Sequence, residues 1–204
     1  MKPVRGELVR LHPETQNEDL TDEGLVAACA TADRAARALL FARHVDSVHR
    51  FVARMRGSDA DSVEDIVQQT FLSAFQSAAT FRGGNVRGWL YGIAANLVRN
   101  YARGEIRRKR ALEAVADLDG LVARGPRDPM TQASLARIPE ALAALPHDLR
   151  AAVVLVDLQG EKGSDAAHAL GIPTGTLWRR VFHGRQALRE ALGIETDGPT
   201  RGTR

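Results

Sequence analysis

Apolar residues recur at intervals of three and four along most of the chain, and nowhere do they alternate with polar residues as in a half-buried strand. The first such row spans residues 25–55 and stops at the sequence GSD of residues 57–59. A second row spans residues 63–78, and a third begins at Trp89 and continues into a basic stretch. This pattern predicts an all-α fold built from successive amphipathic helices.

The apolar pattern weakens from residue 111 onward, where Gly120, Gly125, Pro126 and Pro129 accumulate, as is typical of a linker. Further apolar rows follow at residues 135–145, 153–158, 164–170 and about 174–192. We therefore expect two small helical domains joined by a flexible linker. The expected divisions are a flexible arm over 1–23, a first domain over 24–110, a linker over 111–133, a second domain over 134–193 and a tail over 194–204.

The charges are distributed unevenly along the 204 residues, although the formal net charge is only +3. Six cations and one anion lie between Arg99 and Arg110, and four arginines without any acid lie between Thr176 and Arg189. Between these two segments, residues 111–130 carry four acidic residues against two arginines. Two separate basic segments favour a polyanion that is contacted at two places.

Several classes of protein are disfavoured by what the sequence lacks. Cys29 is the only cysteine, which excludes an intramolecular disulfide and a cysteine-based zinc site, and the six histidines are scattered without a metal-binding spacing. Glu64 and Asp65 are adjacent and so face different directions on a helix. No nucleophile and base are paired, so we expect no enzyme, no cofactor and no metal. The chain also lacks a signal peptide and a run of about 18 apolar residues, so we expect a cytoplasmic protein without a membrane span.

The sequence DAAHALGIPTGTLWRRV at residues 165–181 predicts a helix-turn-helix. The small Ala167 lets two helices approach, Gly171 supplies the turn, and a second helix opens at Pro173 or Thr174. Residues of this second helix that we expect to face DNA in the major groove are Thr174, Thr176, Trp178, Arg179, His183 and Arg185. The alternative is a helical hairpin whose basic face is merely solvated.

Amides and guanidiniums share one face of the helix that begins near Trp89, because they recur at intervals of three and four. They are Asn96, Arg99, Asn100, Arg103 and Arg107, with the aromatic residues Trp89, Tyr91 and Tyr101 at the two ends. Cations for phosphates, amides for base edges and aromatic rings for stacking together suit an opened DNA strand. The alternative is that Trp89 and Tyr101 are core and the arginines are merely solvated.

Two sets of motifs resemble the extracytoplasmic-function (ECF) sigma factors of bacterial RNA polymerase. The sequences DIVQQTFLSAF at 65–75, FR at 81–82 and WLYGIAANLVRNY at 89–101 resemble the second conserved region of that family. The C-terminal half of the chain resembles the fourth conserved region of that family. The matching residues are LP at 145–146, Arg150, LGIP at 170–173, GT at 175–176, Arg180, Arg185 and LR at 188–189. Both regions stand in the family's order with a linker between them.

The resemblance implies a non-enzymatic subunit that directs core RNA polymerase to promoters and opens the −10 element. Asp65, Gln68, Gln69 and Phe71 would dock on the clamp helices of the largest polymerase subunit, and residues 142–156 would contact the flap of the second-largest subunit. The implied −10 contacts are Arg82, Asn85, Trp89, Asn96, Arg99, Asn100, Arg103 and Arg107. The second helix of the helix-turn-helix would read the −35 element. An anti-sigma protein is the expected regulatory partner.

The sequence departs from the family's pattern at several positions. The loop between Phe81 and Trp89 is a residue shorter, which leaves Asn85 as the candidate that holds a flipped base, and a glutamine stands at 69 where glutamate is usual. The sequence GSDAA at 163–167 replaces a more hydrophobic pattern, and we expect Gly163 and Ala166 to weaken helix packing. Tryptophan and arginine at 178–179 replace the common lysine and serine, which predicts an unusual −35 preference.

A different class of DNA-binding protein also fits part of the chain. An independent helix-turn-helix regulator that binds duplex DNA as a dimer would account for the last third, but it leaves the segment from Asp65 to Tyr101 without a role. An enzyme acting on nucleic acid is a weaker third alternative, since no catalytic cluster is present. DNA binding with and without core polymerase distinguishes these alternatives.

Overall fold

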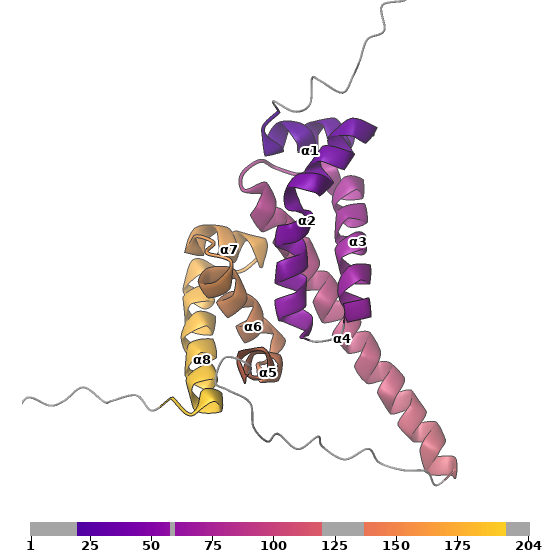
Figure 1. The fold of residues 1–204 in the computed structure, drawn as a ribbon, viewed down its shortest axis with the longest axis vertical. Coiled ribbons are helices and arrows are strands. Elements are labelled where there is room, and N and C mark those ends of the chain that lie inside the picture. Colours follow the sequence, from indigo (N-terminus) through magenta and orange to yellow (C-terminus); the bar gives the residue numbers. More distant parts are fainter. Residues whose placement is uncertain (1–19, 58–59, 120–136, 195–204) are drawn as a thin grey trace, which may run out of the picture.

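The computed structural model describes residues 20–57, 60–119 and 137–194, and within these ranges every regular element is helical (Figure 1). The N-terminal bundle consists of α1 (Asp22–Ala30), α2 (Arg34–Arg56), α3 (Ala60–Ser77), a 3-10 turn (Ala78–Thr80) and α4 (Val86–Asp119). The C-terminal bundle consists of α5 (Arg137–Ala144), α6 (His147–Val153), a π-helical turn (Val154–Leu158), α7 (Gly163–Ala169) and α8 (Thr174–Leu192). The predicted all-α fold with two helical domains is confirmed.

Polar side chains fix where three of the N-terminal helices begin. Thr21 Oγ1 accepts a hydrogen bond from the Gly24 amide (3.2 Å), and Asp33 Oδ1 accepts one from the Ala36 amide (3.0 Å). Asn85 caps α4 in the same way. Such caps satisfy amides that have no partner within the helix. Because of the first cap, α1 begins at Asp22, slightly inside the predicted arm, and the arm's residues 1–19 lie outside the described residues.

The core of the N-terminal bundle is formed by the predicted apolar rows of α2, α3 and α4. Its largest fully buried side chains include Phe51, Ile66, Leu90 and Tyr91. The ring centroids of Phe51 and Tyr91 lie 4.9 Å apart, so the aromatic residues join α2 to α4.

The helix α4 extends further than the sequence pattern indicated. It runs to Asp119, into the segment predicted as a linker over 111–133. The segment ALEAVADLD at 111–119 is rich in good helix formers and contains no glycine or proline before Gly120, so helix propensity carries α4 onward although the apolar pattern fades. Residues 120–133 of the predicted linker lie outside the described residues. Figure 1 shows the end of α4 projecting beyond the rest of the bundle.

Small residues allow the C-terminal bundle to pack closely. At Gly184, where α8 crosses α6, an added Cβ would lie 2.5 Å from Val153 Cγ2. Ala166 is 0% exposed, and an added Cβ at Gly163 would lie 2.6 Å from Cζ2 of Trp178. The expectation that Gly163 and Ala166 weaken the packing is therefore wrong, because these positions make room for a neighbouring helix and for the indole ring.

The two bundles lie against each other, with α7 on α4 and α5 on α2 (Figure 1). Arg150 of α6 donates hydrogen bonds to the backbone carbonyls of Met55, Ala143 and Leu145. Its guanidinium therefore links the end of α2 in the N-terminal bundle to the C-terminal bundle. At Gly92 of α4 an added Cβ would lie 2.3 Å from the carbonyl oxygen of Ala169. A glycine is therefore needed at 92 for this arrangement.

Candidate nucleic-acid and protein interfaces

One surface of the N-terminal bundle carries most of the residues predicted to contact the −10 element. We define the −10-reading surface as the loop 82–88 together with the face of α4 that bears Asn96, Arg99, Asn100, Arg103 and Arg107. Of the predicted residues, those classed as exposed are Arg82, Asn85, Asn96, Asn100, Arg103 and Arg107. The helix thus brings amides and guanidiniums to one side, as their spacing predicted.

Carboxylates hold the loop at the start of this surface. Asn85 accepts from the Gly88 amide through Oδ1 (3.0 Å), and its Nδ2 donates to Glu161 Oε2 (2.8 Å) and Asp165 Oδ2 (3.1 Å). Arg87 Nε lies 2.6 Å from Glu161 Oε1, and the Glu161 side chain is 2% exposed. Asn85, the candidate for holding a flipped base, therefore has its amide fully engaged within the folded chain.

Arg99 is also engaged rather than free. Its Nη2 lies 2.8 Å from Asp148 Oδ1, while Arg180 of α8 lies 2.9 Å from the other oxygen of the same carboxylate. Partial burial acts to raise the pKa of Asp148, but the hydrogen bond with His147 and the Arg180 and Arg99 guanidiniums outweigh it and hold that pKa below its ordinary value. Asp148 is thus an anion that joins α4 to α6 and α8.

The aromatic residues near this surface pack within the protein. Tyr91 is 1% exposed, and its hydroxyl lies 3.2 Å from the side-chain amide of Gln159. Trp89 is half-buried, with its ring 5.0 Å from that of Phe81. Tyr91 is therefore core, whereas Trp89 and Tyr101, which the alternative placed in the core, are both half-buried.

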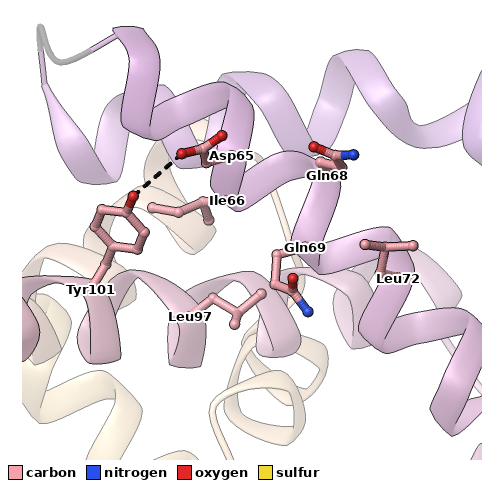
Figure 2. A pocket seen from close by; sticks show the side chains of 7 residues that line it. All are labelled: Asp65, Ile66, Gln68, Gln69, Leu72, Leu97 and Tyr101. Atoms are coloured by element: carbon pink, nitrogen blue, oxygen red, sulfur yellow. Dashed lines mark hydrogen bonds between the residues drawn. The ribbon is translucent and has the colours of Figure 1, made fainter.

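A groove between α3 and α4 holds three of the four residues predicted to dock on polymerase (Figure 2). Asp65, Gln68 and Gln69 line it and are exposed, and the Tyr101 hydroxyl lies 3.4 Å from Asp65 Oδ2. The lining is completed by Ile66, Leu72, Leu97 and Tyr101. Polar rims around exposed apolar side chains are typical of protein interfaces.

Phe71 does not belong to this surface. It is 2% exposed, and its ring packs against that of Phe41 with centroids 4.8 Å apart, because it lies on the core stripe of α3. Leu72, which is 45% exposed, takes the place beside Gln69 instead. Leu72 was missed, although an apolar residue that falls outside the stripe and among polar neighbours is a usable signal.

The helix α8 presents its predicted DNA-facing residues to the outside. Thr174, Trp178, Arg179, His183 and Arg185 are exposed, whereas Thr176 is half-buried. Arg185 forms a two-pronged ion pair with Asp157, with distances of 3.0 Å from Nε and 2.5 Å from Nη2, so it is partly engaged. Phe182 was missed; it is 64% exposed and belongs to the same outward side.

Two further features bear on the chemistry of the described residues. No cluster of His, Cys, Asp or Glu able to hold a metal ion occurs among them, and none of their helices is long and apolar enough to cross a membrane. Cys29 is buried, and this burial raises the pKa of its thiol. A protonated buried thiol is a poor nucleophile.

Two family models match the two bundles in turn. "Sigma-70 region 2" matches residues 40–108, and "Sigma-70, region 4" matches residues 135–188. The first match covers the groove and the −10-reading surface, and the second covers the helix-turn-helix.

The chain is also similar to curated sigma factors. It is 35% identical to ECF RNA polymerase sigma factor SigE of Mycolicibacterium smegmatis, over 80% of this chain and 65% of that protein. It is 34% identical to ECF RNA polymerase sigma factor SigM of Mycobacterium tuberculosis (87% and 88%), and 30% identical to the ECF RNA polymerase sigma-E factor of Haemophilus influenzae (86% and 97%).

Two solved structures share the fold. One is the sigma factor RpoE in complex with the anti-sigma factor NepR from Bartonella quintana, with a TM-score of 0.56, 29% identity, and coverage of 78% of this chain and 98% of that chain. The other is CnrH in complex with the cytosolic domain of CnrY, with a TM-score of 0.62, 26% identity, and coverage of 86% and 99%. Together with the two matched regions, these similarities place the chain in the family of ECF sigma factors of RNA polymerase, to which it belongs.

Proposed function

We propose that this protein directs core RNA polymerase to a specific set of promoters, with the N-terminal bundle opening the −10 element and α8 reading the −35 element. The observation that carries this proposal is the pairing of two surfaces on one bundle. A groove lined by Asp65, Gln68 and Gln69 lies on α3, and the amide and guanidinium face lies on the adjoining α4. One bundle can therefore bind polymerase and hold an opened strand together.

The residues suit the two tasks physically. Exposed Arg103 and Arg107 supply charge for phosphates, and the amides of Asn96 and Asn100 can hydrogen-bond base edges. Bases captured in this way offset the few kcal/mol that unstacking costs. No hydrolysis of a nucleotide enters this scheme.

A regulatory partner follows from the structural similarities. One similar solved structure is a sigma factor in complex with an anti-sigma factor, and the other is CnrH in complex with the cytosolic domain of CnrY. We propose that an anti-sigma protein covers the polymerase-docking faces of both bundles, including the groove lined by Asp65, Gln68 and Gln69. Since polymerase and promoter DNA are its proposed partners, the cytoplasm is the proposed location.

In vitro transcription with purified core polymerase tests the proposal. Wild-type protein should yield discrete start sites that core enzyme alone does not produce. Asp65→Lys should reduce these transcripts about tenfold or more, since it reverses the charge at the groove. Glu64→Lys is the matched control, because Glu64 is exposed on the same helix but does not line the groove.

Two results would contradict the proposal. Wild-type protein that stimulates no promoter with core enzyme would remove the function itself. Equal activity of the two charge-reversal variants would remove the role of the groove.

A further inference from the structure

The loop 82–88 of the −10-reading surface is held by α1 as well as by its own helix. The Gly84 amide donates a hydrogen bond to Glu23 Oε1 (2.6 Å), and the next residue, Asn85, caps the start of α4. Gly83 and Gly84 have φ angles of 84° and 97°, which glycine adopts readily and other residues do not. Two such glycines in succession leave the backbone many conformations, so a contact that selects one of them matters here.

The first turn of α1 is itself anchored to α2. The two carboxylate oxygens of Asp22 lie 3.3 Å from Arg43 Nη1 and 2.9 Å from His44 Nε2. The same nitrogen of Arg43 also donates a hydrogen bond to the Leu20 carbonyl (2.7 Å), and Leu25 is 0% exposed in the core. The carboxylate that follows Asp22 therefore reaches the loop from a fixed support.

We infer that Glu23 is a positioning residue for promoter opening. Its carboxylate holds the loop at Gly84, and the loop presents the exposed Arg82 and Asn85 to the opened strand. Glu23 acts through the loop and needs no contact with DNA of its own. This inference rests on the proposed function, because it concerns how a part of the −10-reading surface is held in place.

Helix electrostatics alone does not explain this arrangement of Glu23. A carboxylate in the first turn of a helix is favourable by itself, and both Asp22 and Glu23 stand in the first turn of α1. That benefit concerns α1 only, whereas the hydrogen bond to Gly84 reaches a segment 61 residues further along the chain. A loop that is ordered before its ligand arrives loses less conformational entropy on binding, so the contact should strengthen capture of the opened strand.

Two substitutions at Glu23 separate the hydrogen bond from the charge. Glu23→Ala removes the acceptor, whereas Glu23→Gln keeps an oxygen that can accept from the Gly84 amide and removes only the charge. Glu64→Ala is the matched control, because it removes an exposed carboxylate of the same bundle at the start of α3, away from the loop.

Permanganate footprinting with core polymerase, on a promoter mapped by transcription, measures the opening. Glu23→Ala should reduce it about fivefold, as expected for the loss of one hydrogen bond, while Glu23→Gln and Glu64→Ala stay near the wild-type level. Glu23→Ala should also discriminate less between this promoter and one with a single changed −10 base. A general loss of stability would not alter that discrimination.

Hydrogen exchange at the Gly84 amide, followed by NMR in the free full-length chain, reports on the contact directly. This amide should exchange about fivefold faster in Glu23→Ala and at the wild-type rate in Glu23→Gln. The fraction of folded protein, measured by thermal unfolding, should be the same in all four proteins at the temperature of the experiments.

Three results would overturn the positioning role. They are wild-type opening by Glu23→Ala, an unchanged exchange rate of Gly84 in that variant, and a Glu23→Gln variant as impaired as Glu23→Ala. Absence of transcription with wild-type protein would instead overturn the proposed function, and the exchange rate of Gly84 would still show whether Glu23 holds the loop.

Discussion

The two surfaces proposed to contact DNA differ in how their polar side chains are paired within the folded chain. On α8, Trp178, Arg179 and His183 are exposed, although the Trp178 indole packs beside Gly163 of α7. On the −10-reading surface, Asn85, Arg87 and Arg99 are bound to carboxylates of the C-terminal bundle. Polar contacts thus hold the −10-reading surface to the other bundle, whereas Arg185 of α8 is paired with Asp157 of its own bundle.

This difference suits the two proposed DNA targets, which are a duplex and an opened strand. Duplex DNA is always present, and a helix can read it without deforming it. An opened strand exists only where polymerase helps to melt the promoter.

The largest expected effect is a loss of stability in the C-terminal bundle, which carries the exposed side of α8. Gly184→Val should destabilise the C-terminal bundle by about 3 kcal/mol, because its side chain would overlap Val153 and the backbone of Leu149. Gly175→Val on the same helix is the control, since a Cβ there meets nothing within 4 Å. Denaturant unfolding measures both variants, and equal stability of the two would contradict the packing of α6 on α8.

Charge reversal on the −10-reading surface comes next. Arg103→Glu should weaken capture of the opened strand about tenfold, or about 1.4 kcal/mol, because Arg103 is exposed on the same helix face as Arg99, which pairs with Asp148. Permanganate footprinting of promoter complexes measures the opening. Core binding by this variant should remain at the wild-type level; its loss would place Arg103 in the docking surface instead.

A smaller effect tests the packing of the Trp178 indole of α8 against Gly163. Gly163→Ala should displace Trp178, because the new Cβ would lie 2.6 Å from Cζ2 of that ring. We expect a cost of about 1 kcal/mol in binding to promoters that have a −35 element and none on promoters read through −10 alone. Gly175→Ala serves as the control in duplex-binding titrations, and an unchanged fluorescence of Trp178 in Gly163→Ala would argue against the contact.

The smallest effect is the dependence of stability on pH. Burial lowers the pKa of His147, helped by Arg99, and burial also lowers the pKa of His44. The unfolded chain takes up these protons more readily, so the histidines contribute full stability above about pH 6.5 and lose it as the pH falls below that value. The slope should not exceed about 1.4 kcal/mol per pH unit for each histidine. Unfolding of His44→Gln and His147→Gln across this range should show a flatter slope than wild type.

The sequence predicted the elements well because the core rows of α2, α3 and α8 are strongly periodic. It ended α4 too early, since helix propensity alone carries the helix to Asp119 after its apolar row fades. It placed Phe71 at an interface because a family motif does not distinguish a contact residue from the core residue that supports it. The contact of Gly163 with Trp178 was also beyond reach, because Gly163 was expected to weaken packing and Trp178 was expected to face DNA.

The contacts of Asn85 and Arg87 with Glu161 could not have been predicted, since the residues lie far apart in sequence and join two bundles across a linker. Spacing within one helix indicates which residues share a face, but not which distant segment covers that face. The amides and arginines of α4 therefore lie on one helix face as their spacing predicted, while the pairing of Arg99 with Asp148 was missed.

The most direct measurement of the central claim is promoter-DNA binding by the full-length chain with and without core polymerase, using a duplex that contains both elements. We predict weak binding by the chain alone, strong binding with polymerase, and opening of the −10 element only in the ternary complex. Tight occupancy of the duplex by the chain alone, with no association with core polymerase, would contradict a sigma factor and favour an independent regulator.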